Sequence, residues 1–158
     1  MNKRSTLKAV AAAALFALAG LAQAQQTIKI ANIVELSGPG TTAGTVFKNG
    51  VELAVKEINE SGGILGKKIE NYTVDTQTNP GVAKGLTQKA VDDGVVAIFG
   101  PVYSGSIMVS MAESKRAGIP NFTGGEAASI TAQGNPYVFR TSFGQSAAFP
   151  KLAKYINA

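Results

Sequence analysis

Residues 28–75 read IKIANIVELSGPGTTAGTVFKNGVELAVKEINESGGILGKKIENYTVD, and this stretch decides the fold class. An extended apolar run at 28–34 is followed by a turn cluster, a helical run at 43–60 and a second extended run at 69–75. In the helical run, apolar residues recur at spacings of four, three and four, the period of one helix face, and these are Phe47, Val51, Ala54 and Ile58. The segment therefore predicts a strand–helix–strand unit.

The same alternation continues along the rest of the chain. Asn79-Pro80 predicts a helix start, because the Asn side chain can cap the first turn and proline is tolerated there. The run VVAIF at 95–99 is typical of a strand that is buried on both faces of a parallel sheet. The other expected elements are helices at 80–92, 104–116 and 147–157 and strands at 119–122 and 137–141. In the last helix, one side is expected to carry the apolar residues Phe149, Leu152, Ala153 and Ile156.

Repeated strand–helix units predict an α/β fold, a doubly wound parallel sheet with helices on both faces and three layers in all. In such sheets a ligand binds outside the carboxyl ends of the strands, at the topological switch point. Three loops rich in Gly, Ser and Thr follow strands there, at 37–42, 101–106 and 123–129. We therefore expect a binding site built from these loops.

The composition excludes much of enzyme chemistry. The 158 residues include no Cys, which rules out disulfides, thiolate metal sites and cysteine nucleophiles. They include no His, which rules out imidazole ligands and triads that need a histidine base. We expect no catalysis, no metal and no cofactor.

Residues 1–24 have the pattern of a secretory signal peptide. Lys3, Arg4 and Lys8 form a positive start, residues 9–22 carry no charge, and the segment ends in a small-x-small cleavage pattern, AQA. We expect a helical leader that is cleaved after residue 24 and export to the periplasm. The alternative is an uncleaved anchor, although an apolar run of 14 residues is short for a membrane span.

The net charge argues against nucleic acid as a partner. Three of the 15 Lys and Arg residues lie in the leader, so its removal lowers the formal charge from +5 to +2. The remaining basic residues are scattered and do not form a stripe interleaved with aromatic residues.

The first loop, GPGTTAG at 38–44, weakly resembles a dinucleotide-binding fingerprint, and Asp75 could end the strand that follows it. Its glycine spacing differs from that fingerprint, and Pro39 lacks an N–H that could face a phosphate. Either its glycines simply make a tight turn, or the loop contributes to a ligand site.

Two further loops offer polar groups. In the second loop, Ser104 or Ser106 could cap the following helix or, together with free backbone N–H groups, bind a ligand carboxylate. In the third loop, Glu126 is either a solvated loop charge or the partner of a ligand ammonium. Ser104 is a poor nucleophile candidate because the chain has neither a G-x-S-x-G elbow nor a His.

Several stretches resemble the Leu/Ile/Val-binding family of periplasmic solute-binding proteins, the type I receptors of branched-chain amino-acid ABC importers. In chain order they are residues 28–70, DTQTNPGVAKGLTQKAV at 75–91, VAIFGPVYSGS at 96–106, AGIPNF at 117–122 and YVFRTSFGQSAAFPKLAKYI at 137–156. The resemblance implies a protein that closes two lobes over a branched-chain amino acid, or a related small amino acid or carboxylate, and delivers it to an inner-membrane permease.

The resemblance also implies which residues bind the ligand. They are Thr42, Val102, Tyr103, Ser104, Gly124, Gly125 and Glu126. Ser104 matches the family serine that binds the α-carboxylate. Glu126 stands where the family has a small hydroxyl residue, and Thr42 or Ala43 stands where the first loop often has an aromatic residue.

Length is the largest departure from the family pattern, in which the chain crosses into a second lobe and returns. We expect residues 25–158 to be an N-terminal lobe without the second lobe, with weak ligand affinity and with apolar surface left open for self-association. One alternative is a one-lobe module that dimerises or binds a partner, or a non-functional truncated product. A distant alternative is a secreted dehydrogenase-like enzyme.

Overall fold

The computed structural model describes residues 27–157, which form a five-stranded parallel sheet with helices on both faces. The strands are β1 (Ile28–Val34), β2 (Ile69–Asp75), β3 (Ala97–Phe99), β4 (Asn121–Thr123) and β5 (Val138–Arg140). The helices are the 3-10 turn η1 (Gly38–Gly40) and α2 (Thr41–Glu60), α3 (Pro80–Asp92), α4 (Ser104–Ala117), α5 (Ser129–Ala132) and α6 (Gln145–Ile156). The leader expected at 1–24 lies outside the described residues.

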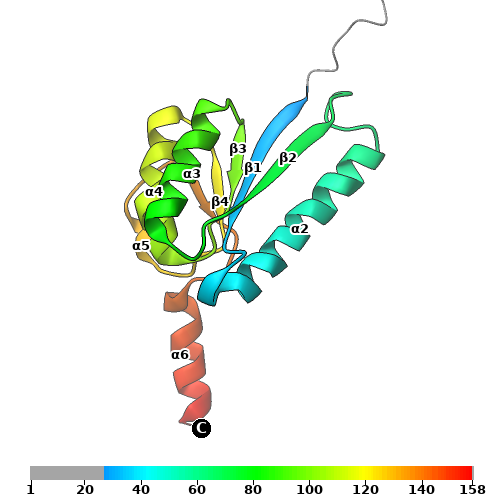
Figure 1. Ribbon diagram of the computed structural model, residues 1–158. Helices are drawn as coiled ribbons and strands as arrows, with labels where there is room; N and C mark the ends of the chain where they lie inside the picture. Colours follow the sequence, from blue (N-terminus) through cyan, green and yellow to red (C-terminus); the bar gives the residue numbers. More distant parts are fainter. Residues whose placement is uncertain (1–26, 158) are drawn as a thin grey trace, which may run out of the picture.

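The strand order β2-β1-β3-β4-β5 makes the sheet doubly wound. The chain runs from β1 to one side and then returns past it to the other side, so the switch point lies between β1 and β3. Helix α2 lies on one face of the sheet, and α3 and α4 lie on the other (Figure 1). The expected three-layer α/β fold is therefore confirmed.

The face under α3 and α4 is filled with apolar side chains. One cluster joins the sheet to α3 through Ala31, Ile33, Ala90, Val95 and Ile98. A second cluster joins α4 to α5 and β5 through Ile107, Met111, Ile130 and Val138. All of these side chains are buried, and they form the core of the molecule.

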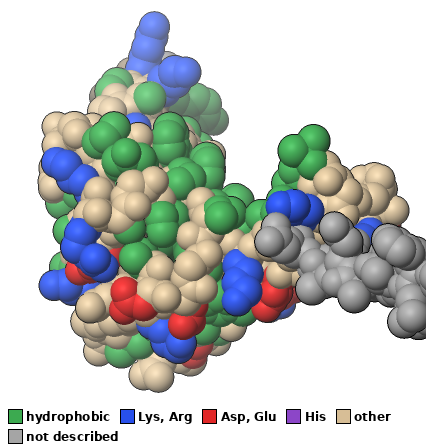
Figure 2. Space-filling model, turned by 90° about the horizontal axis from the view of Figure 1, so that it is seen from above, with side chains coloured by type: hydrophobic (Ala, Val, Ile, Leu, Met, Phe, Trp, Pro, Cys, Tyr) green, Lys and Arg blue, Asp and Glu red, His purple; other side chains and the backbone are tan. Residues whose placement is uncertain are grey.

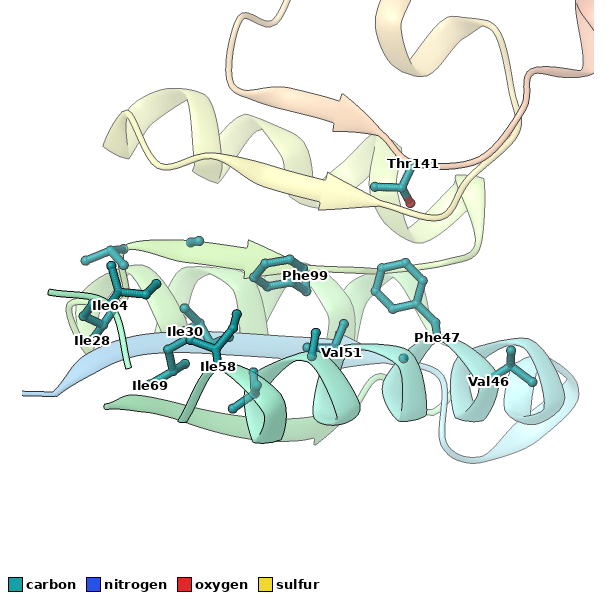
Figure 3. A pocket seen from close by; sticks show the side chains of 15 residues that line it. Ile28, Ile30, Val46, Phe47, Val51, Ile58, Ile64, Ile69, Phe99 and Thr141 are labelled. Atoms are coloured by element: carbon teal, nitrogen blue, oxygen red, sulfur yellow. The ribbon is translucent and has the colours of Figure 1, made fainter. Parts of the chain in front are cut away.

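The α2 face is apolar but open. Helix α2 contacts β1 and β2, and a groove of about 570 Å³ runs between the helix and the sheet. Figure 3 shows α2 side chains turned toward β1 and β3 across this groove. Figure 2 shows the surface hollowed between the α2 side and the rest of the molecule, with hydrophobic side chains along the hollow. The residues that line the groove include Ile28, Ile30, Val46, Phe47, Val51, Ala54, Val55, Ile58, Ile69 and Phe99.

The helix boundaries mostly follow the sequence signals. The side-chain Oδ1 of Asn79 accepts hydrogen bonds from the amides of Gly81 and Val82, at 2.8 and 3.2 Å, and so caps α3 as expected. Gly118 ends α4 in the left-handed conformation, with φ 68°. The four-residue helix α5 was not anticipated from the sequence, because it is too short to show a period.

One packing expectation, burial of the 95–99 run on both faces, was wrong. Val96 is 54% exposed, because β3 is only three residues long and α2 does not cover it. In addition, the apolar side of α6 is not buried, and α6 projects away from the sheet (Figure 1). Among the described residues, no helix is long and apolar enough to cross a membrane.

Candidate functional site

A cleft of about 550 Å³ lies at the carboxyl end of the sheet, where β1 and β3 diverge at the switch point. Its walls come from the loop after β1 with the start of α2, from the loop after β3, and from the segments after β4 and β5. The lining residues are Pro39, Thr42, Ala43, Val46, Phe47, Val102, Tyr103, Gly124, Thr141 and Ser142. Helix α6 leaves the body at this end of the molecule (Figure 1).

The cleft brings together four of the seven residues expected at the site. Thr42, Val102, Tyr103 and Gly124 line it together. The other three expected residues, Ser104, Gly125 and Glu126, do not line it. The three loops chosen from the sequence therefore converge, but only some of their residues face the cleft.

Glu35, just after β1, is the central polar residue beneath the cleft. Its side chain is fully buried. Its carboxylate accepts hydrogen bonds from the backbone amides of Val102 and Tyr103, both at 3.1 Å. These two amides are therefore already engaged, and among the backbone N–H groups expected to bind a ligand carboxylate, only those in the first turn of α4 remain.

Two glycines allow this close approach. A Cβ added to Gly44 would overlap the carbonyl oxygen of Glu35, so only glycine lets the start of α2 pack against the end of β1. Gly100 has a φ of +93°, and an added Cβ would overlap the carbonyl oxygen of Ile33. In the first loop, Gly44 thus allows α2 to pack closely against β1. A structural role of this kind does not require a bound nucleotide.

Asp75 fixes the start of the first loop from the neighbouring strand. Its carboxylate accepts hydrogen bonds from the amides of Leu36, Ser37 and Gln77 at 2.8, 3.1 and 2.8 Å and from the Ser37 hydroxyl at 2.6 Å. Burial alone raises the pKa of Asp75, but these hydrogen bonds outweigh it and hold the pKa below its ordinary value of 3.8. Asp75 is a loop anchor here.

Neither serine of the second loop caps α4, so the interpretation of Ser104 or Ser106 as a helix cap was wrong. Tyr103 occupies the N-cap position of α4, and no side chain caps the helix there. The amide of Ala127 instead donates a hydrogen bond to Ser104 Oγ, at 3.4 Å. Ser106 is buried. Ser104 thus ties the second loop to the third.

The third loop is held by its backbone. The Ser142 hydroxyl donates to the carbonyl oxygen of Gly125 at 2.9 Å, and Arg140 Nη1 donates to the carbonyl oxygens of Glu126 and Ala127 at 3.3 and 3.2 Å. The Glu126 side chain is exposed and forms no ion pair with any described residue. This geometry fits the interpretation of Glu126 as a solvated loop charge better than its interpretation as the partner of a ligand ammonium group.

Sequence reasoning missed five residues of the site: Glu35, Val46, Phe47, Thr141 and Ser142. Phe47 was assigned only to the inner face of its helix, yet it lines both the cleft and the groove. Thr141 and Ser142 follow β5 directly, and their position at a strand end was the available signal. Glu35 also follows a strand, but nothing in the sequence indicates its burial.

The cleft combines an apolar wall with hydroxyl and backbone groups. Phe47, Val46 and Val102 offer apolar contact to a side chain or ring, and Thr42 and Tyr103 add hydroxyl groups to the same lining. Helix α4 begins immediately after Tyr103, and the first N–H groups of a helix have no partner within it. Within residues 27–157, no cluster of three or more acidic residues could hold a metal ion.

Comparison with known proteins agrees with this architecture. Residues 27–158 match the family described as periplasmic binding protein. The Leu/Ile/Val-binding protein BraC3 of Rhizobium johnstonii is 34% identical over 152 residues, which cover 96% of this chain and 41% of that protein.

Two solved structures extend the comparison. The branched-chain amino acid transporter substrate-binding protein LivJ of Streptococcus pneumoniae, in complex with isoleucine, is 35% identical with a TM-score of 0.74, and the match covers 77% of this chain and 35% of that chain. A solute-binding protein of an ABC transporter from Rhodopseudomonas palustris, in complex with 3,4-dihydroxybenzoic acid, is 28% identical with a TM-score of 0.68, covering 75% and 32%. The chain spans well under half of each of these relatives. The chain therefore belongs to the periplasmic binding protein family, and its relatives include the solute-binding proteins of branched-chain amino-acid transporters.

Proposed function

We propose that the chain is one lobe of the substrate-binding component of an ABC importer, which binds a branched-chain amino acid or a related small carboxylate in the periplasm and passes it to a membrane permease. The observation that carries the proposal is the cleft at the switch point, with its apolar wall beside the start of α4. Helix N-termini favour carboxylates because their free N–H groups and the helix dipole are both positive.

The affinity of this lobe alone should be weak. A small-molecule site normally buries most of its ligand, whereas this cleft is walled by a chain that spans 41% of its Rhizobium relative. Relatives bind isoleucine in one case and 3,4-dihydroxybenzoic acid in another. Amino acids and aromatic carboxylates are therefore both candidate ligands, and they share a carboxylate and an apolar group.

Amide NMR titration of the purified chain with L-isoleucine, L-leucine and 3,4-dihydroxybenzoate tests the proposal. We expect shifts confined to the cleft loops and saturation only in the millimolar range, roughly −4 kcal/mol of binding free energy. Gly124→Val should abolish the shifts, because even a Cβ there would lie 3.2 Å from the Phe47 ring. The matched control is Gly85→Val, on α3 with open space around it.

Two outcomes would count against parts of this proposal. Micromolar or tighter binding would contradict the expectation that the lobe alone binds weakly. If none of the three compounds shifts the cleft resonances, the proposed ligand class is wrong.

We propose self-association as a second candidate role, supported by two open apolar surfaces. The groove under α2 is lined almost wholly by hydrophobic residues. Helix α6 exposes Phe149, Leu152 and Ile156 by 58, 52 and 71%. The helix has 12 residues and the groove follows α2 from Val46 to Ile58, so both are about 18 Å long at 1.5 Å per residue. A second copy could therefore seat its α6 in the groove.

Sedimentation of the purified chain across a range of concentrations tests this second role. We expect a dimer that Val46→Glu converts to monomer, because Val46 is 68% exposed in the groove and tolerates a charge in the monomer. Val109→Glu is the control, since Val109 is 40% exposed on α4, away from the groove. A monomer at all concentrations would exclude the role.

A further inference from the structure

We infer that Glu35 is a positioning residue of the cleft, whose buried carboxylate fixes the two cleft-lining residues Val102 and Tyr103. The inference rests on the proposed function only where ligand binding is used as a readout. Glu35 lies at the end of β1, and Val102 and Tyr103 lie between β3 and α4, so the contact joins the two sides of the switch point.

The Glu35 carboxylate accepts two hydrogen bonds, one at each oxygen. Oε2 of Glu35 accepts from the amide of Val102 and Oε1 accepts from the amide of Tyr103, each at 3.1 Å. The carboxylate is wholly inaccessible to solvent. The two carboxylate oxygens bind the amides of two consecutive residues. These two hydrogen bonds together fix the orientation of the backbone at residues 102–103.

The charge of Glu35 makes this contact costly to break. Among the described residues, no Lys or Arg forms an ion pair with it. A buried carboxylate without a cation needs its hydrogen bonds to offset the loss of hydration. The N-cap residues of α2 and α4, Gly40 and Tyr103, both lie close to Glu35, and the dipoles of helix N-termini favour a negative charge. The carboxylate thus holds the loop, and the loop in turn stabilises the carboxylate.

The Glu35 side chain also lies against the first loop, which forms another wall of the cleft. A Cβ added to Gly40 would lie 2.8 Å from the Glu35 Cβ, so the first loop rests directly on the Glu35 side chain. The Tyr103 hydroxyl donates to the carbonyl oxygen of Pro39 at 3.3 Å, which connects the second loop back to the first. One buried side chain therefore sets the relative position of both walls.

The test compares Glu35→Gln with Thr87→Val in the purified chain. Gln keeps one acceptor oxygen but places an NH₂ group against the second amide, which can no longer be satisfied. Thr87 is also fully buried, and its hydroxyl donates to the carbonyl oxygen of Ala83 at 2.9 Å, within α3 and away from the cleft. Both variants lose one buried hydrogen bond, but only Glu35→Gln changes the cleft.

Amide NMR well below the melting temperature provides the first readout, which needs no ligand. In Glu35→Gln we expect altered shifts and faster hydrogen exchange at residues 102–106, and in Thr87→Val neither change. If residues 104–106 are unaffected in Glu35→Gln, Glu35 is an ordinary buried acceptor and the inference is overturned.

L-isoleucine titration provides the second readout. We expect Glu35→Gln to weaken binding at least tenfold and Thr87→Val less than twofold. Equal or tighter binding by Glu35→Gln would overturn the positioning role. If the unaltered chain does not respond to L-isoleucine, the proposed ligand is wrong, while the exchange measurement still decides the role of Glu35.

Discussion

The two faces of the sheet are both apolar, but only one of them is closed. Under α3 and α4, Ile33, Ile98 and Ile107 are completely buried. On the α2 face, the rings of Phe99, Phe122 and Phe139 stack across β3, β4 and β5 with centroids 5.3 and 5.2 Å apart, yet Phe139 is 46% exposed. Hydrophobic pattern alone thus does not say which face forms the core.

The α2 layer is held differently from the α3 and α4 layer. Helix α2 lies over a groove, and its start is fixed by the hydrogen bonds of Asp75 to the preceding loop and by the close approach of Gly44 to Glu35. Helix α3 instead packs its buried Ala83 and Ala90 directly against neighbouring elements. The closed face should therefore dominate stability, and the α2 face should be the more sensitive to acid.

The largest expected effect comes from the closed face. Ile98→Ala should lower the free energy of unfolding by about 2–5 kcal/mol, because it leaves a cavity among buried side chains. Phe139→Ala, on the open face, should cost only about 1 kcal/mol, because much of that ring is already in water and its main contact is one stacked pair. Urea unfolding of both variants measures the difference, and equal losses would remove the distinction between the faces.

A smaller effect is expected at the start of the α2 layer. Because the folded pKa of Asp75 lies below its ordinary value, its stabilising contribution is complete above pH 3.8 and is lost as the pH falls through the folded pKa. Asp75→Asn should cost about 1–2 kcal/mol at neutral pH, since the hydrogen bonds to a charged acceptor are weakened. It should also flatten the stability curve below pH 4. Thermal melts from pH 2 to 7 test this, and an unchanged acid profile would contradict it.

The smallest expected effect lies on the closed face. The hydroxyl of Tyr72 is buried and has no hydrogen-bond partner among the described residues. Burial, and secondarily the charge of Asp93, raises the pKa of Tyr72. Tyr72→Phe should change the free energy of unfolding by less than about 0.5 kcal/mol, because it removes a polar atom that makes no bond. A loss above about 1 kcal/mol would show that this hydroxyl is satisfied in solution.

The sequence predicted the elements better than their surroundings. The Asn79-Pro80 start of α3 and the Gly118 end of α4 are local signals, and both are present. The burial of Val96 was predicted wrongly, because it depends on whether a helix from a distant part of the chain covers β3.

The candidate site shows the same division. The three loops were identified because strand ends of a parallel sheet meet at one edge, and four of their expected residues do line one cleft. Ser104 and Glu126 were chosen by residue type and by the family resemblance, but their surroundings give Ser104 a contact with the third loop and leave Glu126 in solvent.

The sequence by itself determined the α/β class, the order of strands and helices, and the edge of the sheet where a ligand would bind, because these follow from local periodicity, caps and the handedness of strand–helix–strand units. Only the tertiary structure decided that Glu35 is buried and bonded to Val102 and Tyr103, and that the α2 face stays open. Those features depend on contacts between residues up to 68 positions apart, which no local pattern records.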